Sequence, residues 1–192
     1  MGSGVRRVVL TAAAVSLLSG AALAQERPAA NMSFFITSAG PGDGGNLGGL
    51  KGADAHCSAL AKAAGAGNKT WRAYLSATAG GPNGGPVHAR DRIGSGPWYN
   101  ANGRLVGQNV DELHSYQTRM SMREAVAENG AIIPGGGYAP NRHDILTGSQ
   151  PDGTAFSGSE DMTCNNWTSS GEGKAKVGHH DRAAWNSAHD SR

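Results

Sequence analysis

The sequence predicts an α+β domain in which loops make up much of the chain. One segment, residues 52–64, carries apolar side chains at helical spacing, and several short β-rich runs surround it. Glycine is unusually frequent, with 30 residues in 192, and only 17% of residues are charged. Four tryptophans and clear apolar patterns nevertheless exclude a disordered chain, so we expect a folded domain with long connections.

The first 24 residues have the features of a bacterial secretory signal peptide. Arg6 and Arg7 precede an apolar run from Val8 to Leu18, and Ala22-Leu23-Ala24 forms a small-x-small cleavage site. The run is shorter than the ~20 residues that a membrane-spanning helix needs. We therefore expect a single domain over residues 25–192, secreted or periplasmic, with no membrane span after cleavage.

The expected exported domain has no formal net charge. The full chain has 17 basic and 15 acidic residues, and the first 24 residues contain two of the arginines and no acid. A protein that binds nucleic acid or anionic membranes in a general way needs a basic excess. The composition therefore argues against nucleic acid as a partner.

Residues 52–64 form the best predicted helix, which Gly65 and Gly67 should end. Its expected inner face is lined by small and apolar side chains, namely Ala53, Cys57, Leu60, Ala61 and Ala64. Such small side chains allow close approach to a sheet. We expect Cys57 to point inward.

Two β-rich runs flank this helix along the chain. Asn31–Thr37 is the expected first strand, and Thr70–Ser76 is the expected second strand, with Trp71, Ala73 and Leu75 on one face. The remaining expectations are short strands at 104–106, 131–134 and 145–148, a turn at 102–103, and one or two helical turns within 110–129. Arg90-Asp91-Arg92 could bind an anion, but we favour a local salt-bridge network.

Residues 143–185 are the expected binding region. This stretch is rich in turn residues, amide and carboxylate oxygens, and it contains two tryptophans. Long polar loops with aromatic faces are typical of surfaces that bind ligands. The pattern does not identify the ligand.

Several motifs together resemble endostatin, the C-terminal domain of collagens XV and XVIII. The chain has a glycine-rich turn followed by Gly52-Ala53-Asp54-Ala55-His56-Cys57, and then Trp71-Arg72-Ala73-Tyr74-Leu75-Ser76. Thr147 to Gly153 and Cys164 to Trp167 match later segments of the same domain. The resemblance extends from Met32 to about Trp185, and it covers a family of exported bacterial proteins with this fold.

The resemblance implies a C-type-lectin-like fold with a twisted, mainly antiparallel sheet, one or two packed helices and long loops. In that fold the cysteine on the helix pairs with one in the last strand. Cys57 and Cys164 match the first two of the four positions, and the other two would lie beyond Arg192. The resemblance therefore implies a domain missing its last strand, two free thiols without a disulfide, and a tendency to self-associate through an exposed strand edge.

Gln150-Pro151-Asp152 matches a tripeptide that galactose-type C-type lectins use for calcium and sugar. Those lectins complete the site with Trp-Asn-Asp, whereas this chain has Trp185-Asn186-Ser187. Calcium prefers six to eight oxygen ligands, so a site made of Gln150, Asp152 and Asn186 would bind it weakly. The alternative, which we favour, is that residues 150–153 form a β-turn without a resident cofactor.

Histidines next to acids also allow a zinc interpretation. They occur at His143-Asp144, His179-His180-Asp181 and His189-Asp190. However, adjacent histidines point apart on a strand, and the zinc histidines of endostatin lie at its N-terminus, where residues 25–33 of this chain have none. The sequence analysis therefore predicts no metal ligands and no catalytic residues.

We thus expect an exported, non-catalytic binding module that recognises carbohydrate or a cell-envelope surface. Trp167 and Trp185 would stack on sugar faces, while the hydroxyls would be bound by Gln150, Asp152, Asn165, Asn166 and Asn186. One alternative is an enzyme that uses His143, His179 and His180. Another is a structural periplasmic protein with no small ligand.

Overall fold

The computed structural model describes residues 28–182 and 188–191. The predicted signal peptide, residues 1–24, lies outside the described residues, and so do Trp185 and Asn186. In the part of the chain that is described, no helix is both long enough and apolar enough to cross a membrane.

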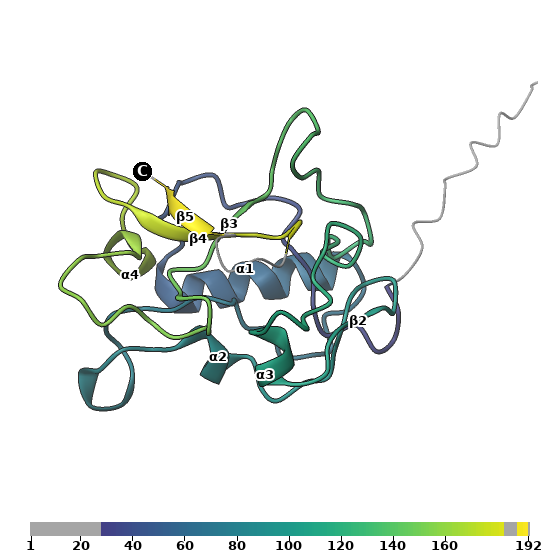
Figure 1. Ribbon diagram of the computed structural model, residues 1–192, viewed down its shortest axis with the longest axis horizontal. Helices are drawn as coiled ribbons and strands as arrows, with labels where there is room; N and C mark the ends of the chain where they lie inside the picture. Colours follow the sequence, from purple (N-terminus) through teal and green to yellow (C-terminus); the bar gives the residue numbers. More distant parts are fainter. Residues whose placement is uncertain (1–27, 183–187, 192) are drawn as a thin grey trace, which may run out of the picture.

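The chain forms a small α+β structure with few helices and short antiparallel strands, which confirms the predicted class at this level (Figure 1). The helical elements are α1 (Gly49–Ala63), η1 (Pro82–Gly84), α2 (Ala89–Arg92), α3 (Val110–Leu113) and α4 (Cys164–Trp167). The strands are β1 (Trp98–Tyr99), β2 (Leu105–Gly107), β3 (Asp144–Leu146), β4 (Ala175–His179) and β5 (Ala188–Ser191).

Helix α1 confirms the predicted helix and begins one turn earlier. Ala53 and Ala61 are buried on its inner face, and Cys57 packs against two apolar clusters. The helix ends where predicted, because Gly65 adopts a left-handed backbone (φ 90°) that a glycine accepts without steric cost.

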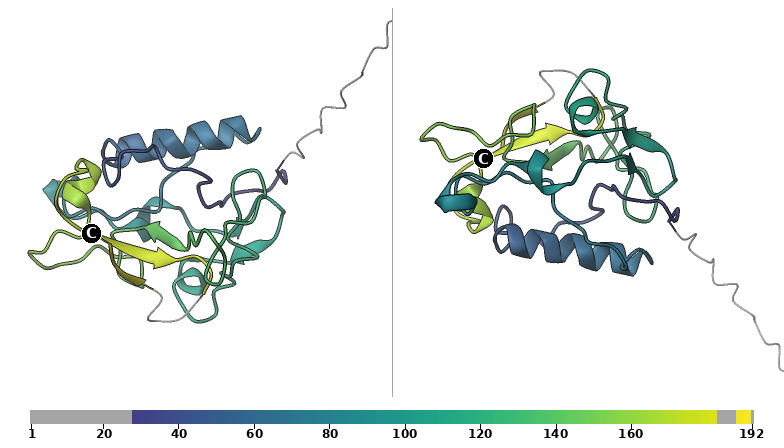
Figure 2. Two further views of the ribbon diagram at one scale, coloured as in Figure 1. Left: turned by 90° about the horizontal axis from the view of Figure 1, so that it is seen from above. Right: turned by 90° about the horizontal axis from the view of Figure 1, so that it is seen from below.

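Two small antiparallel sheets form. Strands β1 and β2 make a hairpin around the turn predicted at Asn102-Gly103, where the Gly103 N–H donates to the carbonyl of Asn100. Strands β3, β4 and β5 make a three-stranded sheet with β4 in the centre. Figure 2 shows α1 on one side of the molecule and this sheet on the other, with irregular segments between them.

Strand β5 corrects an expectation from the sequence. The low apolar content after Val177 predicted no strand there, yet residues 188–191 pair antiparallel with residues 175–178 of β4. The pairing uses main-chain groups, which every non-proline residue supplies. The Lys176 ammonium also lies 2.5 Å from the Asp190 carboxylate across the pair. An edge strand therefore forms from a segment in which Ala188 is the only apolar residue.

The two strands predicted beside α1 are wrong as strands. Within residues 31–37 only Ile36 makes a bridge, to Ala127, and residues 70–76 make no ladder. The predicted facing of residues 70–76 is nevertheless right, because Trp71, Ala73 and Leu75 are buried. The segment is extended and half-buried, but it bonds to side chains and loops where a strand would bond to a neighbouring strand.

Asp54 is one such partner. Its carboxylate accepts from the Ala73 N–H at 2.8 Å and from Arg72 at 2.8 Å. Arg92 donates to both carboxylate oxygens, at 2.8 and 2.9 Å. This buried carboxylate joins α1 to residues 72–73 and to α2. Arg90 and Arg92 therefore form salt bridges, as predicted, but their partners Asp111 and Asp54 are distant in the chain, so the expected local network is wrong.

Other hydrogen bonds also join segments far apart in the chain. The Trp167 indole donates to the carbonyl of Ser76 at 2.7 Å, and the Thr78 N–H donates to the Asn166 side chain at 2.7 Å. The Ser38 hydroxyl donates to the buried Glu128 carboxylate at 2.5 Å. These bonds satisfy buried polar groups that sheets would satisfy in a more regular fold.

The two cysteines are free thiols in the structure. Both side chains are partly buried and pack against one apolar cluster that includes Ala53, Leu75 and Trp167. Burial raises the pKa of Cys57 to about 11, so this thiol is almost entirely protonated at neutral pH and is a poor nucleophile.

Candidate functional site

Residues 150–153 form a β-turn, as the favoured sequence interpretation predicted. The Gly153 N–H donates to the carbonyl of Gln150 at 2.9 Å, and the Gln150 side chain donates to Thr154 and to the carbonyl of Ala155. The Asp152 carboxylate accepts from the hydroxyl and N–H of Thr154, and these bonds lower its pKa. Gln150 and Asp152 thus have local structural roles in the turn.

Residues 164–167 form a left-handed turn. Cys164, Asn165, Asn166 and Trp167 all have positive φ, between 46° and 67°. Such a backbone costs roughly 1–2 kcal/mol per residue for L-amino acids. The Asp161 carboxylate offsets part of this cost, because it accepts from the N–H of Asn165.

Asp161 also accepts from the hydroxyl of Thr163. Burial alone would raise the pKa of Asp161, but the hydrogen bonds from Thr163 and Asn165 outweigh it and lower the pKa. The carboxylate is therefore charged at neutral pH, which keeps it a strong acceptor for the donors of the turn.

The expected sugar-stacking role of Trp167 is wrong. Its side chain is 0% exposed and is hydrogen-bonded to the carbonyl of Ser76. Asn166 is likewise engaged, because its side-chain oxygen accepts from the N–H of Thr78 and of Ala79. Only Asn165 of this group is exposed. The polar residues around Trp167 predict an exposed side chain, whereas Trp167 packs in the core beneath α1.

A shallow, open depression of about 570 Å³ lies at α3. Tyr116 is 73% exposed there. The depression, called the α3 depression below, is lined by Asn109, Asp111, Glu112, Ser115, Tyr116 and Gln117. Two carboxylates and two amides therefore surround an exposed aromatic ring.

Arg90 links the α3 depression to the Gln150 turn. Its guanidinium lies 3.3 Å from the Asp111 carboxylate and donates to the carbonyl of Asp152 at 2.9 Å. Next to it, His114 is hydrogen-bonded to Tyr74 at 2.8 Å, and burial lowers the pKa of His114. Arg90 thus joins the turn to α3, whereas α4, which contains Asn165, lies apart from α3 (Figure 1).

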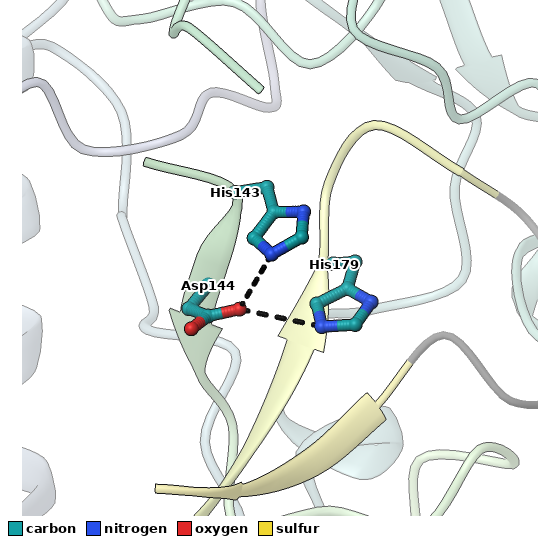
Figure 3. Close-up of side chains that lie close together, drawn as sticks. All are labelled: His143, Asp144 and His179. Atoms are coloured by element: carbon teal, nitrogen blue, oxygen red, sulfur yellow. Dashed lines mark ion pairs between the residues drawn. The ribbon is translucent and has the colours of Figure 1, made fainter. Parts of the chain in front are cut away.

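A second group of side chains, the histidine cluster, consists of His143, Asp144 and His179 (Figure 3). The Nε2 atoms of His143 and His179 lie 3.2 and 3.3 Å from the same Asp144 oxygen, Oδ1. The two imidazole rings are stacked, with centroids 4.2 Å apart and planes 13° apart. Three ligand-type atoms therefore face one point.

Strand pairing explains this geometry. Asp144 and His179 are directly opposite each other in the β3–β4 register, and cross-strand partners place their side chains on the same face. His143 precedes the first residue of β3, so the alternation of a strand does not force it to the opposite face. His180 follows His179 on the other face and is only 2% exposed.

Two neighbours of the cluster have shifted pKa values. Burial would raise the pKa of Asp181, but hydrogen bonds from the Gly136 N–H and Arg182, together with nearby His143, lower it overall. Burial lowers the pKa of His180, although Asp181 and the Arg142 carbonyl oppose this shift. Asp181 lies 3.4 Å from Nδ1 of His143 and is charged at neutral pH.

The structure thus separates the predicted site residues into distinct places. Gln150 and Asp152 lie in a turn that Arg90 joins to α3, Asn165 to Trp167 lie in α4, and Trp185 and Asn186 lie outside the described residues. Sequence reasoning missed Tyr116, although an aromatic residue among Asp111, Glu112 and Gln117 was a visible signal. It noted His143, Asp144 and His179, but it could not place them together without the strand register.

No family model, no curated protein and no solved structure matches this chain.

Proposed function

We propose that the protein is an exported, non-catalytic binding module that recognises carbohydrate or another hydroxyl-rich component of the cell envelope. The observation that carries this proposal is the exposed ring of Tyr116 beside the carboxylates and amides of the α3 depression. A sugar ring has apolar C–H faces, which pack on an aromatic ring, and hydroxyls, which bond to carboxylate and amide oxygens.

The charge pattern of the surface supports the same ligand class. The Asp111 carboxylate is paired with Arg90 at 3.3 Å, and Glu112 is paired with Arg119 at 3.1 Å. Both carboxylates keep oxygen lone pairs for hydroxyl donors, while their charge is balanced. A balanced, polar surface suits a neutral sugar better than a nucleic acid or an anionic lipid.

The proposal includes a more specific fold than the α+β class. A C-type-lectin-like, endostatin-like fold is supported by the short antiparallel strands, by α1 with its Asp54 and Cys57, and by the long irregular segment between β3 and β4. In such a fold, loops present the binding surface and the helix and sheets hold it in place.

A glycan array, run with and without calcium, tests the proposal. We expect the wild-type protein to bind a restricted set of glycans, and Tyr116→Ala to reduce that binding by about 2- to 12-fold, because an aromatic stacking partner contributes roughly 0.5–1.5 kcal/mol. Tyr138→Ala is the matched control, since Tyr138 is also exposed but does not line the depression.

Two results would argue against this proposal. If the wild-type protein binds no glycan with or without calcium, the alternative of a structural protein with no small ligand is favoured. If Tyr116→Ala and Tyr138→Ala bind as well as the wild type, carbohydrate is bound elsewhere. Glycan binding that depends on calcium would instead indicate a calcium site at Gln150 and Asp152.

A further inference from the structure

We propose that His143, Asp144 and His179 bind one divalent transition-metal ion of the zinc class. The three side chains come from the start of β3 and the end of β4, and their ligand atoms lie within 4.8 Å of one another. This site is independent of the carbohydrate proposal, because it shares no residue with the α3 depression.

Two of the three distances between ligand atoms are close to those around a tetrahedral ion, and all three are within 4.8 Å. Zinc binds imidazole nitrogen and carboxylate oxygen at about 2.0–2.2 Å, which separates neighbouring ligand atoms by roughly 3.3–3.6 Å. The two nitrogen-to-oxygen distances in the cluster are 3.2 and 3.3 Å. An ion between the three atoms therefore needs only small side-chain movements.

The kind of ligand identifies the class of metal. Two imidazoles and one carboxylate suit zinc, iron, cobalt, nickel and copper ions, whereas calcium and magnesium prefer oxygen ligands alone. With three protein ligands, a fourth position is left for water or for an outside ligand. Asp144 is 43% exposed, so solvent and ions reach the site.

The surroundings of His143 favour the form that binds a metal. Nδ1 of His143 faces the Asp181 carboxylate at 3.4 Å, and Asp181 is held by the Gly136 N–H at 2.6 Å. The Asp181 carboxylate beside Nδ1 favours the proton there, which leaves a lone pair on Nε2, the atom that faces Asp144. The Arg182 guanidinium, 3.5 Å from the same Nδ1, favours the opposite tautomer, so metal binding at Nε2 requires that the Asp181 contact prevails. Carboxylate–histidine–metal arrangements use this same order of groups.

The loop that contacts Asp181 depends on a glycine, Gly135. A side chain at Gly135 would come within 2.6 Å of the Asp181 carboxylate, so the loop approaches Asp181 closely only because residue 135 has no Cβ. The rival interpretation is a cluster in which protonated histidines pair with the two carboxylates and no metal binds.

Zinc titration of the untagged protein, purified without metal-affinity chromatography, separates these interpretations. We expect one zinc ion per chain with micromolar or tighter affinity, measured against a chromogenic chelator, and no competition from excess calcium. Asp144→Asn keeps the shape of an exposed side chain and should abolish the site. Asp181→Asn acts through His143 and should weaken zinc binding by about 10- to 100-fold.

His56→Gln is the control, because it removes a histidine on α1 that is outside the cluster. Circular dichroism and thermal unfolding in EDTA would establish that each variant is folded. Cobalt substitution gives a second readout, since a tetrahedral cobalt site absorbs visible light strongly. Wild-type zinc binding that is absent, or that is unchanged in Asp144→Asn and His179→Gln, would overturn the proposal.

Discussion

At the scale of single residues, Asp54 has the largest structural role of any described carboxylate. It accepts four hydrogen bonds: one from Arg72, two from Arg92 and one from the Ala73 N–H. The Arg92 side chain is itself only 12% exposed. Removal of the carboxylate would leave a buried guanidinium and a buried N–H without their acceptor, which costs more than the pair contributes on its own.

We therefore expect Asp54→Ala to lower the free energy of unfolding by about 3–5 kcal/mol. Urea denaturation followed by tryptophan fluorescence measures this change. Asp91→Ala, which removes an exposed carboxylate one residue from Arg92, should change stability by less than about 0.5 kcal/mol. An Asp54→Ala variant as stable as Asp91→Ala would mean that the ion pairs contribute nothing net.

The sequence predicted the surroundings of single residues unevenly. It indicated that Arg90 to Arg92 take part in salt bridges, because alternating charges pair locally. It did not identify their partners, since Asp54 is 38 residues from Arg92 and Asp111 is 21 residues from Arg90. For the same reason Trp167 was read as exposed: its burial depends on Ser76, 91 residues earlier, and no local pattern records that contact.

At the scale of elements, the first turn of α1 depends on a glycine. A Cβ at Gly52 would overlap the carbonyl oxygen of Leu47. In an ordinary helix, Gly→Ala stabilises by up to about 1 kcal/mol. Here we expect Gly52→Ala to destabilise the protein by about 1–3 kcal/mol, because the backbone must move to relieve the overlap. Thermal and urea unfolding both report this change.

Ala59→Gly is the matched control on the same helix. Ala59 is exposed, so this variant measures the ordinary cost of a helical glycine, about 1 kcal/mol. If Gly52→Ala proves stabilising, the chain before α1 is free to shift, and the close approach of Leu47 is not required.

Element prediction succeeded where the pattern was local. The helical spacing of residues 52–64 and the Asn102-Gly103 turn are local signals, and both were confirmed. Residues 70–76 gave the correct buried face but no strand, because pairing requires a neighbouring strand and Asp54 takes part of that role. Strand β5 was missed because main-chain pairing with β4 leaves little trace in the side chains.

At the scale of the whole molecule, stability should fall in two steps as pH decreases. Burial lowers the pKa of His114 and of His180. An unfolded histidine takes up a proton near pH 6.5, while these folded histidines do so only at lower pH. The unfolded state therefore binds more protons below pH 6.5, and stability is lost first in that range.

The second step comes from carboxylates whose pKa values are lowered in the folded state. Their stabilising contribution is complete above about pH 5 and is lost as pH falls through about 4 and below. These groups are Asp152, Asp161, Asp181 and Asp190.

Urea midpoints measured from pH 8 to pH 3 in EDTA would reveal both steps, with the metal excluded. His114→Gln should show a smaller loss between pH 7 and pH 5, while His56→Gln should follow the wild type. Stability that rises as pH falls from 7 to 5 would contradict the expected sign.

For the whole molecule, composition and local pattern predicted the α+β class with short strands, and the family resemblance implied that the strands are antiparallel. They did not predict where the functional side chains meet. His143 and His179 are 36 residues apart in the chain, and only the β3–β4 register makes them neighbours. Tyr116 is a candidate binding residue because it lines the α3 depression, and that depression exists only in the folded surface.

The hydrogen bond between Trp167 and Ser76 cannot form until the ribosome has added Trp167, long after Ser76. The two residues are separated by 91 positions, and a ribosome adds about 5–20 residues per second. The cluster beneath α1 must therefore wait roughly 5–18 s for the tryptophan that fills it. During that interval Ala53 and Leu75 lack their main packing partner. The apolar cluster beneath α1 can therefore be completed only after residue 167 has been synthesised.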